Sequence, residues 1–401
     1  MRRSRSIEKT LIPLVLVFGM RALAQESATA NRLLWKTDLR QFGYQRFSGV
    51  KSMRLAVDFA DEEHIAVAWI SPDAARLSER KGPKWGDPAH LHVVVLDART
   101  GQKQSQKDWP AGYSRLPLLL GIPNGQLLIC IGNSLRFVSP ALDLVREQEL
   151  PAHGSCSSAV AQLSPSRRTL LLSIRAERAY EKELLNVQTL TPLSDWTEPK
   201  GAYSDQTIAF SDNWVAGYCG EPREICLRRS SEHEWRPLRS GGLDTQMARG
   251  WHLPVRFLSD ELMVIEQKDT TIATVRGDVV FQIKSPKDHF LFPPTPSAGG
   301  ERFVAIEYKF RGLKSAPLDM YPFVAGDRAI VYGIKDRRAI FSIKLNGTSP
   351  WTPWNTHVNS VALPPNGTSL AVLSDTLLTV YTLSEDSTNR HRLENVRQFP
   401  N

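Results

Sequence analysis

Short apolar stretches alternate with polar turns along almost the whole chain. Runs rich in Val, Ile, Leu and aromatic residues recur between clusters of Gly, Pro, Asn and Asp, and no long amphipathic helix pattern follows the N-terminal segment. Several short strands at regular spacing are typical of an all-β sandwich, barrel or propeller. The pattern therefore predicts an all-β protein.

One unit recurs seven times: an alternating strand, a tight turn and a second apolar strand. The copies occupy residues 53–70, 116–132, 158–174, 205–219, 253–267, 289–308 and 358–375. Their turns fall near Asp61, Asn124, Ser166, Asp212, Asp260, Gly300 and Asn366, which are separated by 63, 42, 46, 48, 40 and 66 residues. A period in the forties is typical of a four-stranded propeller blade, so we predict a seven-bladed β-propeller with four antiparallel strands per blade.

The outer strands and the ring closure follow from the same pattern. Residues 92–109, 134–150 and 328–345 supply further strands after their hairpins, whereas the last unit shows only three clear strands before a polar tail from about residue 385. The segment Leu33 to Leu39 has strand composition and is predicted to add the missing fourth strand. Closure of this kind leaves only short, protected sheet edges, and we expect a single domain over residues 25–401.

The sequence Val-Leu-Asp-Ala-Arg-Thr-Gly-Gln at residues 95–102 resembles the strand-turn-strand signature of seven-bladed propellers in the WD40-like and quinoprotein-like (PQQ-like) repeat group. The resemblance covers nearly all of the chain after its N-terminal segment and implies the propeller architecture. The Gly-His and Trp-Asp dipeptides of true WD40 repeats are absent, and no residue set matches the cofactor chemistry of the group. We therefore expect no cofactor.

Two insertions explain the long steps in the repeat. They span residues 71–90 in the first blade and 309–327 in the sixth, each between the second and third strands. In the propellers that the chain resembles, this connection lies on the same face as the loops between blades, and both blades flank the seventh. The insertions carry the candidate binding residues Arg80, Lys84, Trp85, Phe310, Arg311 and Tyr321. Such a mixture of cations and aromatic rings suits an acidic or sugar-containing partner. The alternative is that the insertions are solvent-exposed loops without a binding role.

The N-terminal segment changes both the predicted compartment and the charge. Four basic residues precede an apolar stretch from Leu11 to Met20, and Ala22-Leu23-Ala24 follows, so residues 1–24 are predicted to be a cleavable signal peptide. Its removal lowers the formal net charge from +8 to +4. The remaining excess is small and forms no long basic run, which argues against a nucleic-acid partner. No other segment is apolar enough to span a bilayer, and we expect a secreted or periplasmic protein.

Four cysteines suit an oxidising compartment. If Pro222-Arg223 forms a two-residue turn, Cys219 lies directly opposite Cys226, within bridging distance. That pairing leaves Cys130 for Cys156. Four free, buried thiols are the alternative.

The remaining motifs carry weaker signals. His90 and His92 share one face of a strand, as a metal pair requires, but a third ligand is missing, so we expect surface histidines and no metal site. The sequons at Asn346 and Asn366 coincide with Asn-Gly turns and are interpreted as turns. The tryptophans at positions 109, 196 and 235 are expected to pack between blades.

We therefore predict a monomeric, non-enzymatic binding or scaffold protein that engages a protein or glycan through its loop face. The alternative is a propeller hydrolase or lactonase with its site at the mouth of the central channel. The polar residues nearest to that mouth are Asp58, Asp205, His252, His289 and Asn359. Several acidic, His or Asn side chains converging there would favour the enzyme, and an apolar or merely basic mouth would favour binding.

Overall fold

The computed structural model describes residues 32–45, 55–73, 86–113, 117–150, 155–156, 159–175, 180–193, 209–219, 224–238, 255–266, 269–285, 289–310, 324–345, 361–374 and 376–383. The predicted signal peptide, the polar tail and most of both insertions lie outside these residues. Within them, no helix combines the length and apolar character needed to cross a membrane.

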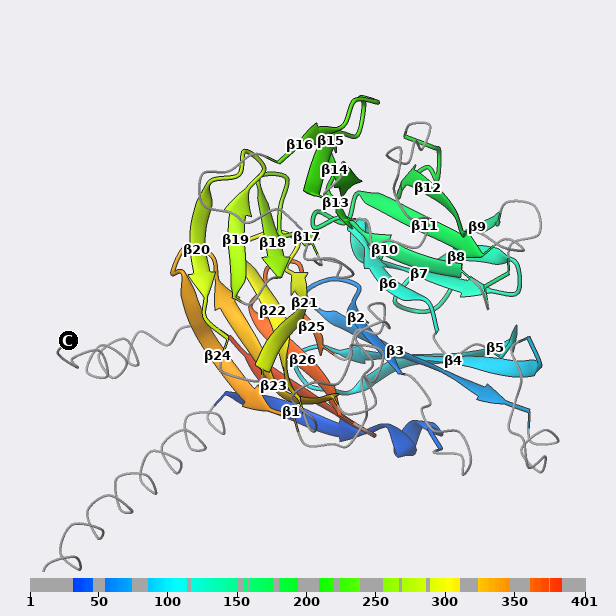
Figure 1. Cartoon of the computed structure of the whole chain (residues 1–401). Coiled ribbons are helices and arrows are strands. Elements are labelled where there is room, and N and C mark those ends of the chain that lie inside the picture. Colours follow the sequence, from blue (N-terminus) through cyan, green and yellow to red (C-terminus); the bar gives the residue numbers. More distant parts are fainter. Residues whose placement is uncertain are drawn as a thin grey trace, which may run out of the picture.

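Seven antiparallel sheets stand side by side in a ring around a central axis (Figure 1). Blades 1 to 6 take their strands in chain order from the inside outwards, and blade 7 combines the two ends of the chain. Blade 3 has three strands within the described residues, and every other blade has four. The prediction of a seven-bladed, all-β propeller is confirmed.

The strand bounds follow the predicted repeat. Blades 1 to 3 consist of β2 (Ala56–Phe59), β3 (His64–Pro72), β4 (Pro88–Asp97), β5 (Lys103–Gly112), β6 (Leu119–Ile122), β7 (Gln126–Ile131), β8 (Ser134–Val138), β9 (Leu144–Glu149), β10 (Ala159–Leu163), β11 (Thr169–Arg175) and β12 (Tyr180–Asn186). Blades 4 and 5 consist of β13 (Ala209–Phe210), β14 (Trp214–Cys219), β15 (Glu224–Arg229), β16 (Arg236–Pro237), β17 (Val255–Phe257), β18 (Leu262–Glu266), β19 (Thr270–Thr274) and β20 (Val279–Ile283). Blade 6 consists of β21 (His289–Pro296), β22 (Arg302–Phe310), β23 (Val324–Gly333) and β24 (Arg338–Lys344), and blade 7 of β25 (Val361–Ala362), β26 (Ser369–Ser374), β27 (Leu377–Thr382) and β1 (Leu33–Asp38). Each predicted hairpin turn falls between the first and second strands of its blade.

The closing strand pairs as predicted. β1 runs antiparallel to β27, with Lys36 opposite Thr379, so the N-terminal strand becomes the outermost strand of blade 7. Asp38 then caps the short 3-10 helix η1 (Leu39–Phe42), because its carboxylate accepts a hydrogen bond from the N–H of Arg40. Figure 1 shows β1 beside the strands from the other end of the chain.

Seven apolar cores hold the ring together, one in each gap between neighbouring blades. The core between blades 7 and 1, for example, contains Trp35, Leu39, Trp69 and Leu378, all at most 9% exposed. The corresponding clusters fill the other six gaps. Because both faces of every blade pack in such a core, its strands are apolar on both sides. The removal of this apolar surface from water favours closure of the ring.

Both predicted disulfides form. Cys130 in β7 is bonded to Cys156, with their Cα atoms 5.5 Å apart, and Cys219 is bonded to Cys226, with their Cα atoms 5.8 Å apart. The predicted register of the second hairpin is wrong, however. Cys219 lies opposite Glu224, and Cys226 lies opposite Gly217. A shift of two positions keeps both cysteines on one face of the sheet, so they bridge as diagonal neighbours.

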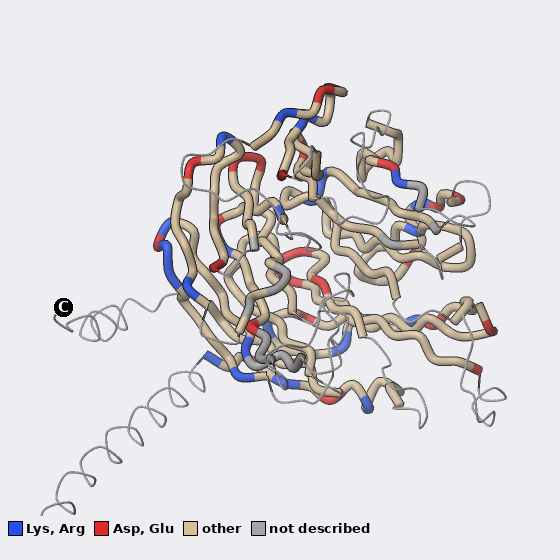
Figure 2. Tube along the Cα trace, viewed as in Figure 1, with Lys and Arg blue, Asp and Glu red and all other residues tan. Residues whose placement is uncertain are grey.

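Charged residues of both signs are interspersed along the described part of the chain (Figure 2). No blade presents a continuous basic stripe in these residues. Several cations also form exposed ion pairs, such as Lys335 with Glu301 at 2.6 Å and Arg136 with Glu147 at 2.9 Å.

Candidate functional site

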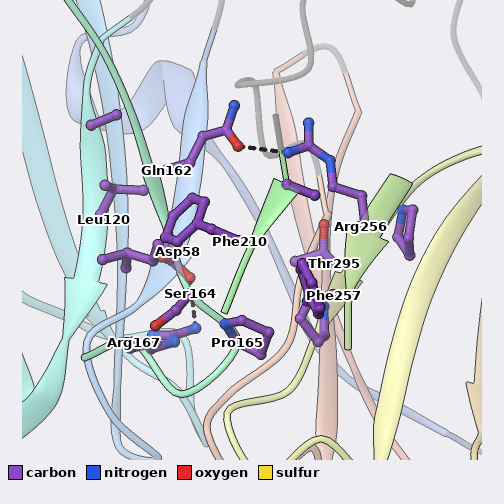
Figure 3. A pocket seen from close by; sticks show the side chains of 15 residues that line it. Asp58, Leu120, Gln162, Ser164, Pro165, Arg167, Phe210, Arg256, Phe257 and Thr295 are labelled. Carbon is purple, nitrogen blue, oxygen red and sulfur yellow. Dashed lines mark hydrogen bonds and ion pairs between the residues drawn. The ribbon is translucent and has the colours of Figure 1, made fainter. Parts of the chain in front are cut away.

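The central channel contains a cavity of about 130 Å³. It is lined by the inner strands of blades 1 to 6 and by the turn that follows β10. Figure 3 shows Phe210, Phe257 and Leu120 on its walls, together with the polar side chains of Gln162, Arg256 and Thr295. The cavity is therefore an apolar pocket with a few polar groups, the usual composition of a small binding site.

An ion pair closes one end of this cavity. Arg167, in the turn between β10 and β11 of blade 3, donates from Nη2 to Oδ1 of Asp58 in blade 1 at 3.1 Å. The same guanidinium donates to three backbone carbonyl oxygens: those of Phe59 at 2.7 Å, Gly121 at 3.2 Å and Leu363 at 3.2 Å. These acceptors belong to blades 1, 2 and 7. One side chain thus links four of the seven blades across the channel axis.

The partner carboxylate is fully engaged. Asp58 is 5% exposed and also accepts hydrogen bonds from the backbone N–H groups of Gly121 at 2.8 Å and Phe59 at 2.9 Å. Burial raises the pKa of the Asp58 carboxyl, and the Arg167 guanidinium and the two N–H groups oppose that shift. Asp58 is the single carboxylate among the described lining residues, and its contacts leave it no evident role as a proton-transfer group.

The turn that aims Arg167 is held by blade 4. Asp212 accepts hydrogen bonds from the hydroxyl groups of Ser164 at 2.7 Å, Ser166 at 2.6 Å and Thr169 at 3.0 Å. Arg167 itself has a φ of 63°, in the left-handed region that non-glycine residues rarely adopt. The contacts to Asp212 offset this backbone strain and orient the turn toward the channel.

The opposite part of the cavity is basic. Arg256 in β17 of blade 5 donates from Nη1 to Oε1 of Gln162 in β10 of blade 3 at 2.6 Å, passing over the short inner strand of blade 4 (Figure 3). Gln162 precedes the turn that carries Arg167, so this contact lies toward the loop face relative to the ion pair. The mouth on that side is apolar and basic in its described residues.

The sequence-predicted inner polar residues do not converge. Asp58 lines the cavity, whereas His289, at the start of β21, is not part of its lining. Asp205, His252 and Asn359 lie outside the described residues.

The predicted binding residues of the insertions are only partly placed. Arg80, Lys84, Trp85, Arg311 and Tyr321 lie outside the described residues, and Phe310 ends strand β22. The insertions do connect second to third strands, β3 to β4 and β22 to β23, and blades 1 and 6 flank blade 7. In a four-stranded meander this connection lies at the end of the blade opposite to the hairpin turns.

His90 and His92 lie in β4, each with an acidic partner. His90 Nε2 is 3.2 Å from Asp73 Oδ1, and His92 Nδ1 is 2.8 Å from Asp108 Oδ1. Nε2 of His92 is in turn 2.5 Å from Oγ of Ser71. No group of three potential metal ligands occurs in the described part of the chain.

Sequence reasoning found the histidine spacing but missed Ser71 and Asp108. Both lie on neighbouring strands, because β3 pairs with β4 and β4 pairs with β5. Asp108 lies directly opposite His92, so the predicted strand pairing, once its register was known, could have identified it.

The other motif predictions have mixed outcomes. Trp109 packs in the core between blades 1 and 2, and Trp235 packs against the core between blades 3 and 4, as expected. Asn366 forms the predicted turn, and its carboxamide oxygen accepts from the N–H and hydroxyl of Thr368 at 3.0 and 2.8 Å. Trp196 and Asn346 lie outside the described residues.

Comparison with known proteins supports the fold and no more. No protein-family model matches the chain, and the search of curated proteins found no significant match. Among solved structures, a chain from "COPII on membranes, outer coat vertex" is similar with a TM-score of 0.50 and 10% identity, covering 83% of this chain and 85% of that one. A chain from "The structure of the COPII coat assembled on membranes" has the same TM-score and identity, but this chain covers only 47% of its length.

Proposed function

We propose that this chain is an exported binding or scaffold protein that engages a protein or glycan partner through the face bearing the insertions 71–90 and 309–327. The observation that carries the proposal is the channel mouth. The described lining of the cavity is apolar with a few polar groups, and Arg256 lies on the side of the mouth. The one carboxylate in this lining, Asp58, forms an ion pair with Arg167 at the other end of the cavity. A lining of this kind favours binding over the alternative, a hydrolase or lactonase at the mouth.

The architecture supports the choice of face. The hairpin turns occupy the other end of the ring, where they contact one another: Asp212 binds the blade 3 turn, and Asn213 donates to Asp260 of the next turn at 3.1 Å. The turns on that face therefore form contacts between neighbouring blades. The insertion face carries the long loops, which are where propellers and other rigid scaffolds place their binding residues.

The similar solved chains support a role in assembly by analogy. They come from structures titled for the COPII coat assembled on membranes. At 10% identity the shared property is the fold, and a protein partner for this chain is our proposal.

Two disulfides support the proposed export, because such bonds persist in oxidising compartments. We propose that residues 1–24 direct secretion or periplasmic delivery and that residues 25–401 form one domain. N-terminal sequencing of protein recovered from the exported fraction is expected to begin at Gln25. Recovery of an uncleaved N-terminus would contradict this part of the proposal.

The binding face is tested with acidic probes. We propose to measure binding of the mature chain to immobilised polygalacturonate and to poly-glutamate. The triple variant Arg80→Ala, Lys84→Ala, Arg311→Ala is expected to weaken binding at least about tenfold, since each removed cation contributes to attraction for an acidic surface.

A matched control removes three cations from turns at the opposite end. Arg99, Arg168 and Arg276 lie in such turns and are exposed. The variant Arg99→Ala, Arg168→Ala, Arg276→Ala has the same net charge as the test variant and is expected to retain binding. Equal losses in the two variants, or no binding of the wild-type chain to either probe, would overturn the proposed face and its acidic partner.

A further inference from the structure

Ser71, His92 and Asp108 form a hydrogen-bonded row across three adjacent strands of blade 1. They belong to β3, β4 and β5, respectively. The Oγ atom of Ser71 is 2.5 Å from Nε2 of His92, and Nδ1 of His92 is 2.8 Å from Oδ1 of Asp108. The row lies away from the channel, on the second, third and fourth strands of blade 1, near the end of the blade that carries the insertion 71–90. It therefore borders the binding face proposed above, and its chemistry is tested separately from binding.

The chemistry of the partners determines the direction of each hydrogen bond. An ionised carboxylate only accepts, so Nδ1 of His92 carries the proton that it donates to Asp108. Nε2 of the neutral ring then has a free lone pair and accepts from the Ser71 hydroxyl. A hydroxyl held against the basic nitrogen of an imidazole, with that imidazole oriented by a carboxylate, is the arrangement that activates a serine nucleophile.

The imidazole is held in place on its face as well as at its edges. The ring of His92 stacks on the indole of Trp69, with centroids 5.2 Å apart and planes 16° apart. Trp69 is 1% exposed and belongs to the core between blades 7 and 1, where Tyr44 meets it edge-on. The base is thus fixed by a rigid core, as a preorganised catalytic group requires.

The row is also accessible. The side chain of His92 is 19% exposed and that of Asp108 is 50% exposed, and Ser71 is half-buried. The neighbouring His90 has its own carboxylate, Asp73, and its ring centroid lies 6.4 Å from that of His92. His90 therefore offers a comparison within the same strand: a second histidine with an acidic partner of its own.

We propose that Ser71 is an activated nucleophile and that this row hydrolyses small carboxylic esters, an activity beyond the proposed binding function. Oγ of Ser71 attacks the ester carbonyl carbon while its proton passes to Nε2 of His92. The carbon–oxygen bond to the alcohol breaks, and Nε2 returns the proton to the departing alkoxide. Water then attacks the acyl-Ser71 ester with His92 again as base, which releases the carboxylic acid and restores the serine.

The first test is covalent labelling. The mature, disulfide-bonded chain is treated with a biotinylated fluorophosphonate, which reacts with activated serines, and the adduct is located by peptide mass spectrometry. We expect the label on Ser71, its loss in Ser71→Ala, and at least about tenfold slower labelling in His92→Gln and Asp108→Asn. The His90→Gln variant is expected to label at the wild-type rate.

The second test is hydrolysis of p-nitrophenyl acetate. We expect the rate to fall on the order of 10²-fold in Ser71→Ala, which removes only a hydroxyl from a half-buried site. Circular dichroism confirms that each variant is folded. No label on Ser71 in the folded wild-type chain, or a hydrolysis rate unchanged in Ser71→Ala, would overturn the proposal and leave the binding function untouched.

Discussion

Arg167 Nη2 and Asp58 Oδ1 meet 3.1 Å apart at the axis of the ring, although 109 positions separate the two residues in the sequence. Both side chains are almost fully buried, at 10% and 7% exposure. The guanidinium also donates to carbonyl groups of blades 1, 2 and 7, so the pair links these three blades to blade 3.

Loss of the Arg167–Asp58 ion pair is expected to lower the stability of the fold substantially. Arg167→Met leaves the buried Asp58 carboxylate without its cation and three carbonyl groups without a donor, and it should lower the free energy of unfolding by about 3–5 kcal/mol. Urea denaturation followed by tryptophan fluorescence measures the loss. Lys335→Met, which breaks an exposed ion pair with Glu301, is the control and should leave the midpoint unchanged. Equal midpoints for the two variants would contradict the role of Arg167.

The closing strand is anchored by Trp35, whose indole Nε1 donates to the carbonyl oxygen of Ala98 at 2.9 Å. A Cβ on Gly101 would lie 2.7 Å from this ring, and Gly101 also has a φ of 72°. Gly101→Ala is therefore expected to destabilise the fold through both backbone strain and a clash. Gly132 has a φ of 64° but open space at its Cβ position, so Gly132→Ala measures the strain alone.

We expect Gly101→Ala to lower the thermal midpoint more than Gly132→Ala does. Trp35→Ala, which removes a buried aromatic ring from the core between blades 7 and 1, should cost about 3–5 kcal/mol. Equal thermal midpoints for the two glycine variants would show that the contact between Trp35 and Gly101 does not stabilise the pairing of the closing strand.

The two disulfides should differ in their contribution to stability. They span 26 and 7 residues, and in the loop-entropy model the longer loop restricts the unfolded chain more. Replacing Cys130 and Cys156 by Ser is expected to cost about 3.5 kcal/mol, and replacing Cys219 and Cys226 about 2.5 kcal/mol. Urea midpoints without reductant give the comparison, and alkylation of the unfolded wild-type chain should detect no free thiol. A larger loss in the shorter hairpin would reverse the expected order.

Asp38 links the closing strand to acid stability. Hydrogen bonds from Arg40 lower the pKa of its carboxyl from 3.8 to about 2. Because the folded pKa lies below the unfolded value, the contribution is present above pH 3.8 and is lost as the pH falls toward 2. Asp38→Asn should therefore flatten the pH dependence of unfolding in this window. NMR titration of the carboxyl carbon of Asp38 measures the pKa directly, and a value near 3.8 would contradict the prediction.

Strand alternation and turn residues in the sequence predict much of the architecture. The turns near Asp61 and Asn366, the hairpins on either side and the closing strand from Leu33 all appear where strand alternation and turn residues predicted them. The hairpin at Cys219 shows the limit of such reasoning: the disulfide was predicted, but its register was wrong by two positions. A two-residue shift preserves which side chains share a face, so the sequence pattern cannot distinguish the two registers.

The candidate sites were less predictable. His92 was noticed for its spacing from His90, yet its partners Ser71 and Asp108 come from separate strands, and only the pairing of β3, β4 and β5 places them in one row. Arg167 is not among the predicted site residues, because no neighbouring sequence pattern indicates a side chain that reaches across the channel.

The sequence by itself determined the blades, the closing strand and the pairing of the cysteines, because strand alternation and turn chemistry are properties of neighbouring residues. Only the tertiary structure decided which side chains meet across the ring. The contact of Arg167 with Asp58 depends on the closure of seven sheets around one axis, and the Ser71–His92–Asp108 row depends on the register of three strands. Each of these contacts requires distances that no local pattern encodes.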